Sequence, residues 1–285
     1  MKIKILFLLI ILSVGLNAQE NTNSIEPLEF IYKIAGSDSL KAYVFFPIDN
    51  SANENHAAIA IFHGGGWSIG EPSWGFGYAQ KYAKLGLVSI AVQYRLSDEN
   101  TITPIDAIED TKDCFIWMRE KTKLLKTNND KIAAFGWSAG AHLIACSAVF
   151  PDYGSDSVIT SIPNALILQS PGLSIVNDRW FKKLLLDKGN PKDFSPAEYI
   201  NGDMPPSIIV VGRDDTVTPI EGSELFHKNL LKYGNESHLF VFDGVGHLFT
   251  PSDQPDNGWP KPDKEISKKA FNEIDLFLKR LNYIK

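Results

Sequence analysis

The sequence has little of what would place it in several large classes of protein. Its 285 residues include only two cysteines, Cys114 and Cys146, which are too few for a disulfide framework or a zinc cluster. We expect both to be reduced residues of the core. Basic residues do not predominate, since 28 Lys and Arg stand against 34 Asp and Glu and the net charge is −6. A nucleic-acid-binding protein would need a basic face. With 44% hydrophobic and 22% charged residues, the composition is typical of a globular protein.

The most apolar run stands at the N-terminus and is too short for a membrane span, which needs about 20 residues. Lys2 and Lys4 lie directly before the apolar run at residues 5–12, and the small residue Ala18 follows it. This order is typical of a signal peptide cleaved after Ala18; an uncleaved anchor is the alternative. We therefore expect a signal peptide at residues 1–18, one domain at residues 19–285 without an integral membrane segment, and export to the periplasm or the extracellular space.

Short apolar runs alternate with segments of helical periodicity along most of the chain. Strands are predicted at residues 30–36, 40–46, 57–62, 87–94, 131–135, 164–169, 207–211 and 238–242, and helices at residues 76–85, 104–124, 139–149, 220–233 and 266–281. Such alternation predicts an α/β fold, a mostly parallel sheet with helices on both faces. The first two strands would form an antiparallel hairpin at one edge. Residues 172–200 are irregular, with one short helix near 180–186, and are a candidate for a small cap insertion.

A candidate nucleophile lies in the pattern G-x-S-x-G at residues 136–140, between a predicted strand and a predicted helix. Glycines on both sides permit a sharp turn that exposes the hydroxyl of Ser138. The start of the helix behind it favours developing negative charge.

A second glycine-rich segment, His63-Gly-Gly-Gly-Trp67, directly follows a predicted strand. Acyl transfer needs backbone N–H donors aimed at the oxygen of the tetrahedral intermediate. We expect these donors to be Gly65, Gly66 and Ala139, and His63 to anchor the loop. A phosphate-binding loop is disfavoured because neither a following Lys-Ser/Thr nor G-x-G-x-x-G is present.

The serine needs a base, and six histidines are available. His247 lies in a glycine-rich loop between the last predicted strand and the last helix, where an imidazole can reach the serine. An acid that orients this imidazole is expected between Ser138 and His247 in sequence. Asp214 and Asp215 follow a predicted strand. We favour Asp215, although the sequence leaves Asp214 open.

These segments together resemble one known family. Residues 63–67, 94–96, 136–140, 212–219 and 246–247 carry the resemblance. The chain is similar to α/β-hydrolases of the bacterial acetyl-esterase and hormone-sensitive-lipase-like group, near the xylan and feruloyl esterases, over residues 28–282. The resemblance implies an α/β-hydrolase fold and a serine carboxylesterase. Trp137 stands where the lipase-like branch usually has an acid, which favours the carbohydrate-esterase branch.

Export, loop tryptophans and this branch predict acetyl or hydroxycinnamoyl esters of a polysaccharide or oligosaccharide as substrates. Tryptophans at 67, 74, 180 and 259 fall in or near loops that could ring the site. We select Trp67, Trp137 and Trp259 as candidate substrate contacts, although any one of them could instead anchor a loop. No metal or organic cofactor is predicted. The alternatives are a prolyl-oligopeptidase-type peptidase and a lipase-like esterase for short acyl chains.

Overall fold

The computed structural model describes residues 25–48, 55–151, 159–255 and 258–285. The predicted signal peptide therefore lies outside the described residues. Within the described part of the chain, no helix is both long and apolar enough to cross a bilayer.

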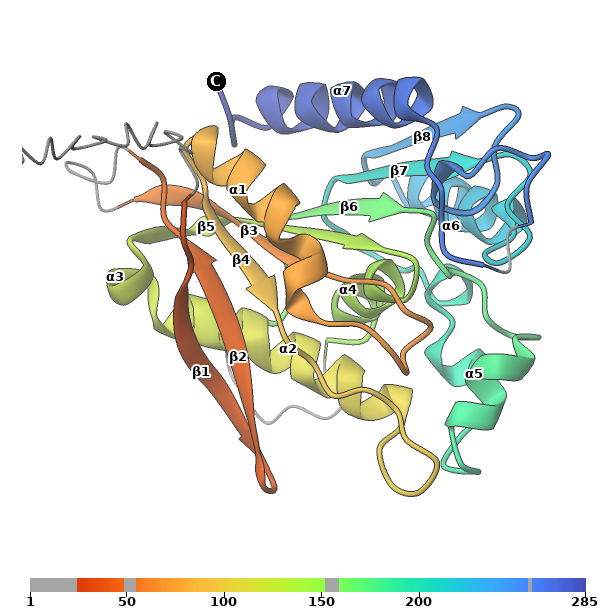
Figure 1. Cartoon of the computed structure of the whole chain (residues 1–285), viewed down its shortest axis with the longest axis horizontal. Coiled ribbons are helices and arrows are strands. Elements are labelled where there is room, and N and C mark those ends of the chain that lie inside the picture. The colour runs from red at the N-terminus through yellow and green to blue at the C-terminus, as the bar shows by residue number, and fades with distance from the viewer. Residues whose placement is uncertain (1–24, 49–54, 152–158, 256–257) are drawn as a thin grey trace, which may run out of the picture.

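One sheet of eight strands forms the centre of the described structure, in the order β1-β2-β4-β3-β5-β6-β7-β8. The strands are β1 (Leu28–Ala35), β2 (Asp38–Phe45), β3 (His56–Phe62), β4 (Val88–Val92), β5 (Thr127–Trp137), β6 (Ala165–Gln169), β7 (Ser207–Gly212) and β8 (Ser237–Phe242). From β4 to β8 in this order all neighbours are parallel. The β1–β2 hairpin adds antiparallel pairs at one edge (Figure 1). The expected sheet is confirmed.

Helices cover both faces of this sheet. Helices α1 (Phe76–Lys84) and α7 (Lys264–Arg280) pack on one face, and α2 (Pro104–Glu120), α4 (Ala139–Val149) and α6 (Ile220–Lys232) pack on the other (Figure 1). Strand β3 illustrates why, since Ala58, Ala60 and Phe62 face α2 and α4 while Ile59 and Ile61 face the α1 side. A strand that is apolar on both faces needs such double cover.

Short elements complete the chain. They are α3 (Thr122–Leu125), α5 (Arg179–Leu184) and the 3-10 turns η1 (Pro72–Gly75), η2 (Pro191–Phe194), η3 (Pro196–Glu198) and η4 (His247–Phe249). The helix expected at 104–124 ends at Glu120, and Lys126 adopts a left-handed conformation after α3. Strand β5 continues to Trp137, beyond its expected end at 135, because Gly136 and Trp137 pair with the last residues of β6.

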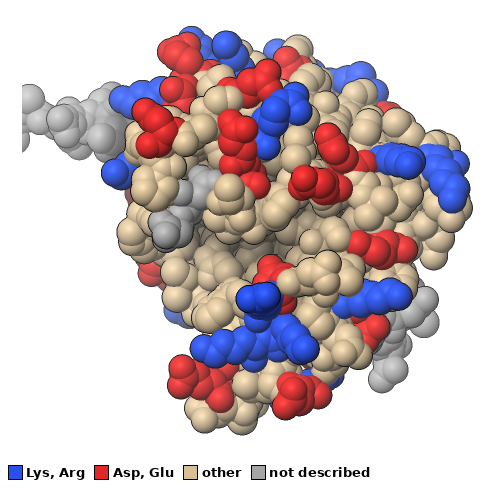
Figure 2. Space-filling view, turned by 90° about the vertical axis from the view of Figure 1, so that its right-hand side faces the viewer, with Lys and Arg blue, Asp and Glu red and all other residues tan. Residues whose placement is uncertain are grey.

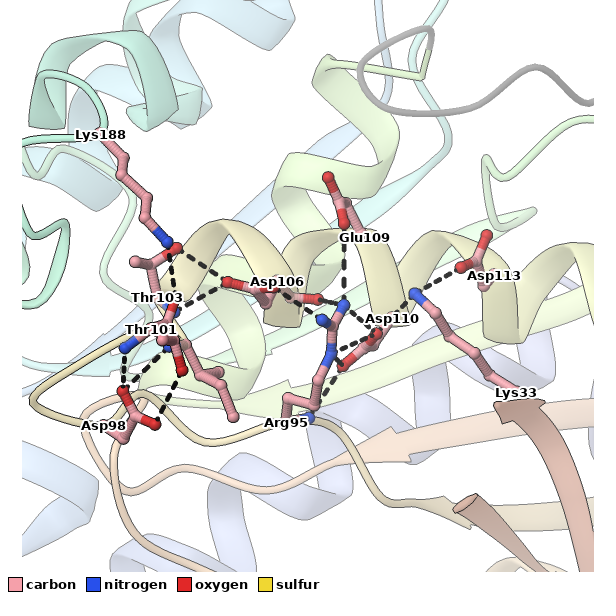
Figure 3. A network of polar contacts seen from close by, with 11 residues as sticks. Lys33, Arg95, Asp98, Thr101, Thr103, Asp106, Glu109, Asp110, Asp113 and Lys188 are labelled. Atoms are coloured by element: carbon pink, nitrogen blue, oxygen red, sulfur yellow. Dashed lines mark hydrogen bonds and ion pairs between the residues drawn. The ribbon is translucent and has the colours of Figure 1, made fainter. Parts of the chain in front are cut away.

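A partly buried ionic network joins the end of β4 to helix α2 (Figure 3). The carboxylate of Asp110 has 0% exposure and accepts hydrogen bonds from the guanidinium of Arg95 at 2.7 Å and the ammonium of Lys33 at 2.6 Å. Arg95 also pairs with Asp106 at 2.7 Å. Asp106 closes a capping box with Thr103 at the first turn of α2. This network therefore fixes the chain that follows β4 against α2.

Candidate active site

The segments singled out by the sequence converge at one edge of the sheet. Strands β3, β5, β7 and β8 are parallel to their neighbours, so their carboxyl ends lie together. The glycine loop, residues 63–67, follows β3. Ser138 follows β5, Asp215 follows β7 and His247 follows β8. In open α/β sheets, ligands bind in the crevice outside these strand ends.

Ser138 occupies a strained backbone conformation, with φ 53° and ψ −121°. Its two flanking glycines are required by contacts on either side. A methyl group at Gly140 would come within 2.2 Å of the Phe62 carbonyl oxygen, and one at Gly136 within 2.6 Å of the Ala141 nitrogen. The tight strand-to-helix turn at Ser138 is therefore possible only with glycine at both positions.

A chain of hydrogen bonds links Ser138, His247 and Asp215. Nε2 of His247 lies 3.0 Å from the Ser138 hydroxyl, and Nδ1 lies 2.9 Å from Oδ2 of Asp215. All three residues are buried, with 8%, 6% and 5% exposure. This is the geometry that a nucleophile, its base and the orienting carboxylate require.

Asp215 is held by backbone donors as well as by the imidazole. The N–H groups of Val217 and Thr218 donate to its Oδ1 at 3.0 and 2.7 Å, and the Thr218 hydroxyl lies 2.8 Å from Oδ2. By contrast, Asp214 accepts from the exposed Ser252 hydroxyl at 2.6 Å. Of the two adjacent acids, the structure places Asp215 against His247.

Two polar residues that the sequence analysis missed support this arrangement. One is Thr218, described above. The other is Ser170, directly after β6, whose hydroxyl accepts a hydrogen bond from the N–H of Leu248, the neighbour of His247, at 3.1 Å. A serine directly after a mostly apolar strand was the available signal for Ser170.

The glycine loop is anchored through its carbonyl groups. Gly64 O accepts from the His63 ring at 2.7 Å, and Gly65 O accepts from the N–H groups of Ser68 and Ile69 at 3.2 and 3.1 Å. In a trans peptide the N–H points opposite to the carbonyl. The N–H groups of Gly65 and Gly66 therefore point away from these anchors. Within the described residues, neither they nor the N–H of Ala139 have a hydrogen-bond partner.

Two other histidines are structural in this arrangement. His63 packs on the Tyr94 ring with a centroid separation of 4.4 Å, and His142 accepts from the Trp67 indole at 3.1 Å. Burial lowers the pKa of each imidazole to about 4, so both are neutral at pH 7. His63 therefore anchors the loop, as expected, and His142 packs beneath it.

A cleft of about 980 Å³ opens above Ser138 and His247. Its lining includes five tryptophans: Trp67, Trp74, Trp137, Trp180 and Trp259. Figure 2 shows the face that contains the carboxyl ends of the strands, where a hollow lined by uncharged atoms is surrounded by charged side chains. A planar, largely apolar group of a ligand would suit this lining.

The three predicted substrate contacts differ in how much surface they offer. Trp67 and Trp137 are 5% and 8% exposed, whereas Trp259 is 71% exposed. The ring of Trp259 packs against Trp74 at a centroid distance of 5.4 Å. Trp259 therefore offers far more free surface to a ligand than the other two.

The described residues offer no group of three or more His, Cys, Asp or Glu side chains that could hold a metal ion. Cys114 and Cys146 are free and buried, which confirms the prediction of reduced core residues.

Comparisons with known proteins agree with this fold. Esterase 2 of Thermogutta terrifontis is 30% identical, with a TM-score of 0.80, and the alignment covers 92% of this chain and 97% of that one. A family model described as BD-FAE matches residues 44–158. The chain belongs to the α/β-hydrolase esterases.

More distant relatives are esterases as well. A probable isoprenylcysteine alpha-carbonyl methylesterase of Arabidopsis thaliana is 25% identical, over 66% of this chain and 44% of its own length. An acetylxylan esterase of Xylanibacter ruminicola is 25% identical, over 69% of this chain and 42% of its own length. The chain thus matches about half the length of these curated relatives.

Proposed function

We propose that this protein is an exported serine esterase that hydrolyses acetyl or hydroxycinnamoyl esters of polysaccharide-derived substrates. The observation that supports the mechanism is the continuous series of hydrogen bonds from Asp215 through His247 to Ser138. Ser138 and His247 line the open cleft. The export rests on the N-terminal sequence pattern alone.

The proposed reaction proceeds through an acyl-enzyme. The Ser138 oxygen bonds to the ester carbonyl carbon while its proton passes to Nε2 of His247. Asp215 holds the imidazole by Nδ1 and stabilises the imidazolium. The N–H groups of Gly65, Gly66 and Ala139 donate to the oxyanion.

Collapse of the intermediate breaks the bond to the alcohol, which leaves with the proton from His247. Water then takes the place of the alcohol: it gives a proton to His247 and attacks the acyl carbon. The bond to the Ser138 oxygen breaks, and the acid is released. The Ser138 hydroxyl is restored at the end of the cycle. No group beyond the chain and water enters this scheme.

The substrate class rests on two kinds of support. The cleft is rich in tryptophan, and indole rings offer flat apolar surfaces on which the rings of sugars and hydroxycinnamates can stack. The distant relation to an acetylxylan esterase points in the same direction.

A lipase-like esterase for short acyl chains is the second candidate. It is favoured by the solved forms of the Thermogutta terrifontis esterase, which include one with propionate and one with butyrate bound.

Hydrolysis of 4-nitrophenyl acetate, butyrate and decanoate and of methyl ferulate by the wild type and by Ser138→Ala tests the proposal. We expect the substitution to lower kcat by about 10⁴–10⁶-fold, because the triad acts as a unit. Activity that survives it would identify a different nucleophile.

The substrates discriminate between the candidates. Turnover of methyl ferulate or acetylated xylo-oligosaccharides supports the polysaccharide assignment. Rapid turnover of acetate and butyrate alone favours the short-acyl esterase. Cleavage of a prolyl amide at a rate that matches the esters would favour a peptidase.

A further inference from the structure

Trp180, on helix α5, contacts the glycine loop directly. Its indole N–H donates a hydrogen bond to the carbonyl oxygen of Gly66 at 3.0 Å. A methyl group on Gly66 would come within 3.2 Å of the indole nitrogen. Trp180 also lines the cleft and is 45% exposed. One side chain thus faces the substrate space and bonds the loop beside it.

With this bond, the carbonyl groups of three consecutive residues, Gly64, Gly65 and Gly66, each accept a hydrogen bond. His63 holds Gly64 O, and the N–H groups of the following turn hold Gly65 O. Gly66 has φ 55° and no side chain to restrict it. Its conformation is therefore defined by the peptides on either side, of which Trp180 holds the second.

Helix α5, which carries Trp180, is held in place by an N-cap hydrogen bond and by the packing of Phe181. Its N-cap, Asp178, accepts a hydrogen bond from the N–H of Phe181 at 2.8 Å. Phe181 is fully buried, and its ring packs edge-on against Trp67 and His142 at centroid distances of 4.9 and 5.3 Å. Trp67 directly follows Gly66, so α5 contacts both residues.

The carbonyl that Trp180 holds belongs to the peptide between Gly66 and Trp67, whereas the N–H of Gly66 belongs to the preceding peptide, which is held through Gly65 O. We infer that Trp180 is a positioning residue that restrains the backbone torsions of Gly66 between these two held peptides and so keeps its N–H aimed at the oxyanion; this inference rests on the proposed esterase mechanism. The role is distinct from substrate stacking, because it acts in the transition state rather than on ground-state binding. A residue that only contacts substrate would alter KM, whereas one that orients an oxyanion donor alters kcat.

The test is Trp180→Phe, which keeps an aromatic ring at this half-exposed position but lacks the N–H. Loss of an entire oxyanion donor costs about 10²–10³-fold in kcat, so misorientation should cost about tenfold, with KM changed by less than about twofold. Kinetics are measured with 4-nitrophenyl acetate and butyrate.

A matched pair of inhibitors separates stabilisation of the oxyanion from ordinary binding in the cleft. 1,1,1-Trifluoro-4-phenylbutan-2-one forms a serine adduct with an oxyanion, whereas 4-phenylbutan-2-one binds as an ordinary ketone. Trp180→Phe should weaken the fluorinated inhibitor by the same factor as kcat and leave the other unchanged. Trp259→Phe, the same exchange at the other exposed tryptophan, should alter KM but not the ratio of the two inhibition constants.

Two results would overturn the inference. One is a wild-type kcat in Trp180→Phe; the other is a loss of kcat without a change in the inhibitor ratio. Ser138→Ala is assayed alongside. If it stays active, the proposed mechanism fails; if it is inactive while Trp180→Phe behaves as wild type, only the role of Trp180 is wrong.

Discussion

Two aspartates, Asp110 and Asp215, both have side chains with 0% exposure, but their partners differ in kind. Asp110 meets the cations of Arg95 and Lys33, which stay charged at every ordinary pH (Figure 3). Asp215 meets backbone N–H groups, a threonine and the imidazole of His247. Only the second set includes an imidazole, which serves as the general base of the proposed reaction.

The comparison shows how the same residue type serves different ends. A carboxylate between an arginine and a lysine holds two segments of the chain together. Both of its partners keep their protons, so it has no role in proton transfer. A carboxylate against an imidazole, which in turn reaches a hydroxyl, is arranged for proton transfer. Burial alone does not distinguish the two aspartates, but the chemistry of their neighbours does.

The substitution Asp215→Asn tests the difference between the two aspartates most directly. An amide can hold the imidazole in the wrong tautomer, so we expect kcat for 4-nitrophenyl acetate to fall by about 10⁴-fold. The neighbouring Asp214→Asn is the control, and it should change kcat by no more than about twofold because that side chain bonds a surface serine. Equal losses in the two variants would remove Asp215 from the proposed mechanism.

Asp110→Asn should act on stability instead. It leaves the buried side of an ion-pair network without its charge, which typically lowers the free energy of unfolding by about 3–5 kcal/mol. Asp113, which pairs with the same lysine but is 38% exposed, provides the control; Asp113→Asn should cost less than about 1 kcal/mol. Urea unfolding at pH 7 measures both, and the folded Asp110 variant should keep its kcat.

The smallest effect per side chain concerns the two structural histidines. Burial lowers the pKa of His63 and His142 from 6.5 to about 4, so the unfolded chain binds protons that the folded chain does not. The free energy of unfolding should therefore fall as the pH drops from about 6.5 to 4, by up to about 3 kcal/mol per histidine.

Urea unfolding between pH 4 and pH 7 measures this dependence. In His142→Gln the difference in slope from the wild type should equal the contribution of one histidine. A slope identical to that of the wild type would mean that His142 is not held neutral by the fold.

Much of the fold followed from local patterns. Helix α4 has the predicted bounds because a G-x-S-x-G turn begins it and a polar, proline-containing stretch follows it. The extra length of β5 could not be predicted, because Gly136 and Trp137 become strand through pairing with residues distant in sequence, Gly136 with β3 and both with β6. Likewise, two adjacent aspartates cannot be told apart by a motif.

The alternation of strands and helices, the glycine turns and the small set of residues capable of acyl transfer follow from the amino-acid sequence. These features depend on local conformational preferences and on the chemical identity of residues that are close together in sequence. Three contacts depend on the folded chain: Asp215 with His247, Asp110 with the cations of Arg95 and Lys33, and Trp180 with Gly66, which is 114 positions away. Such contacts depend on where distant segments come to lie, and the packing of the sheet and its helices sets those positions.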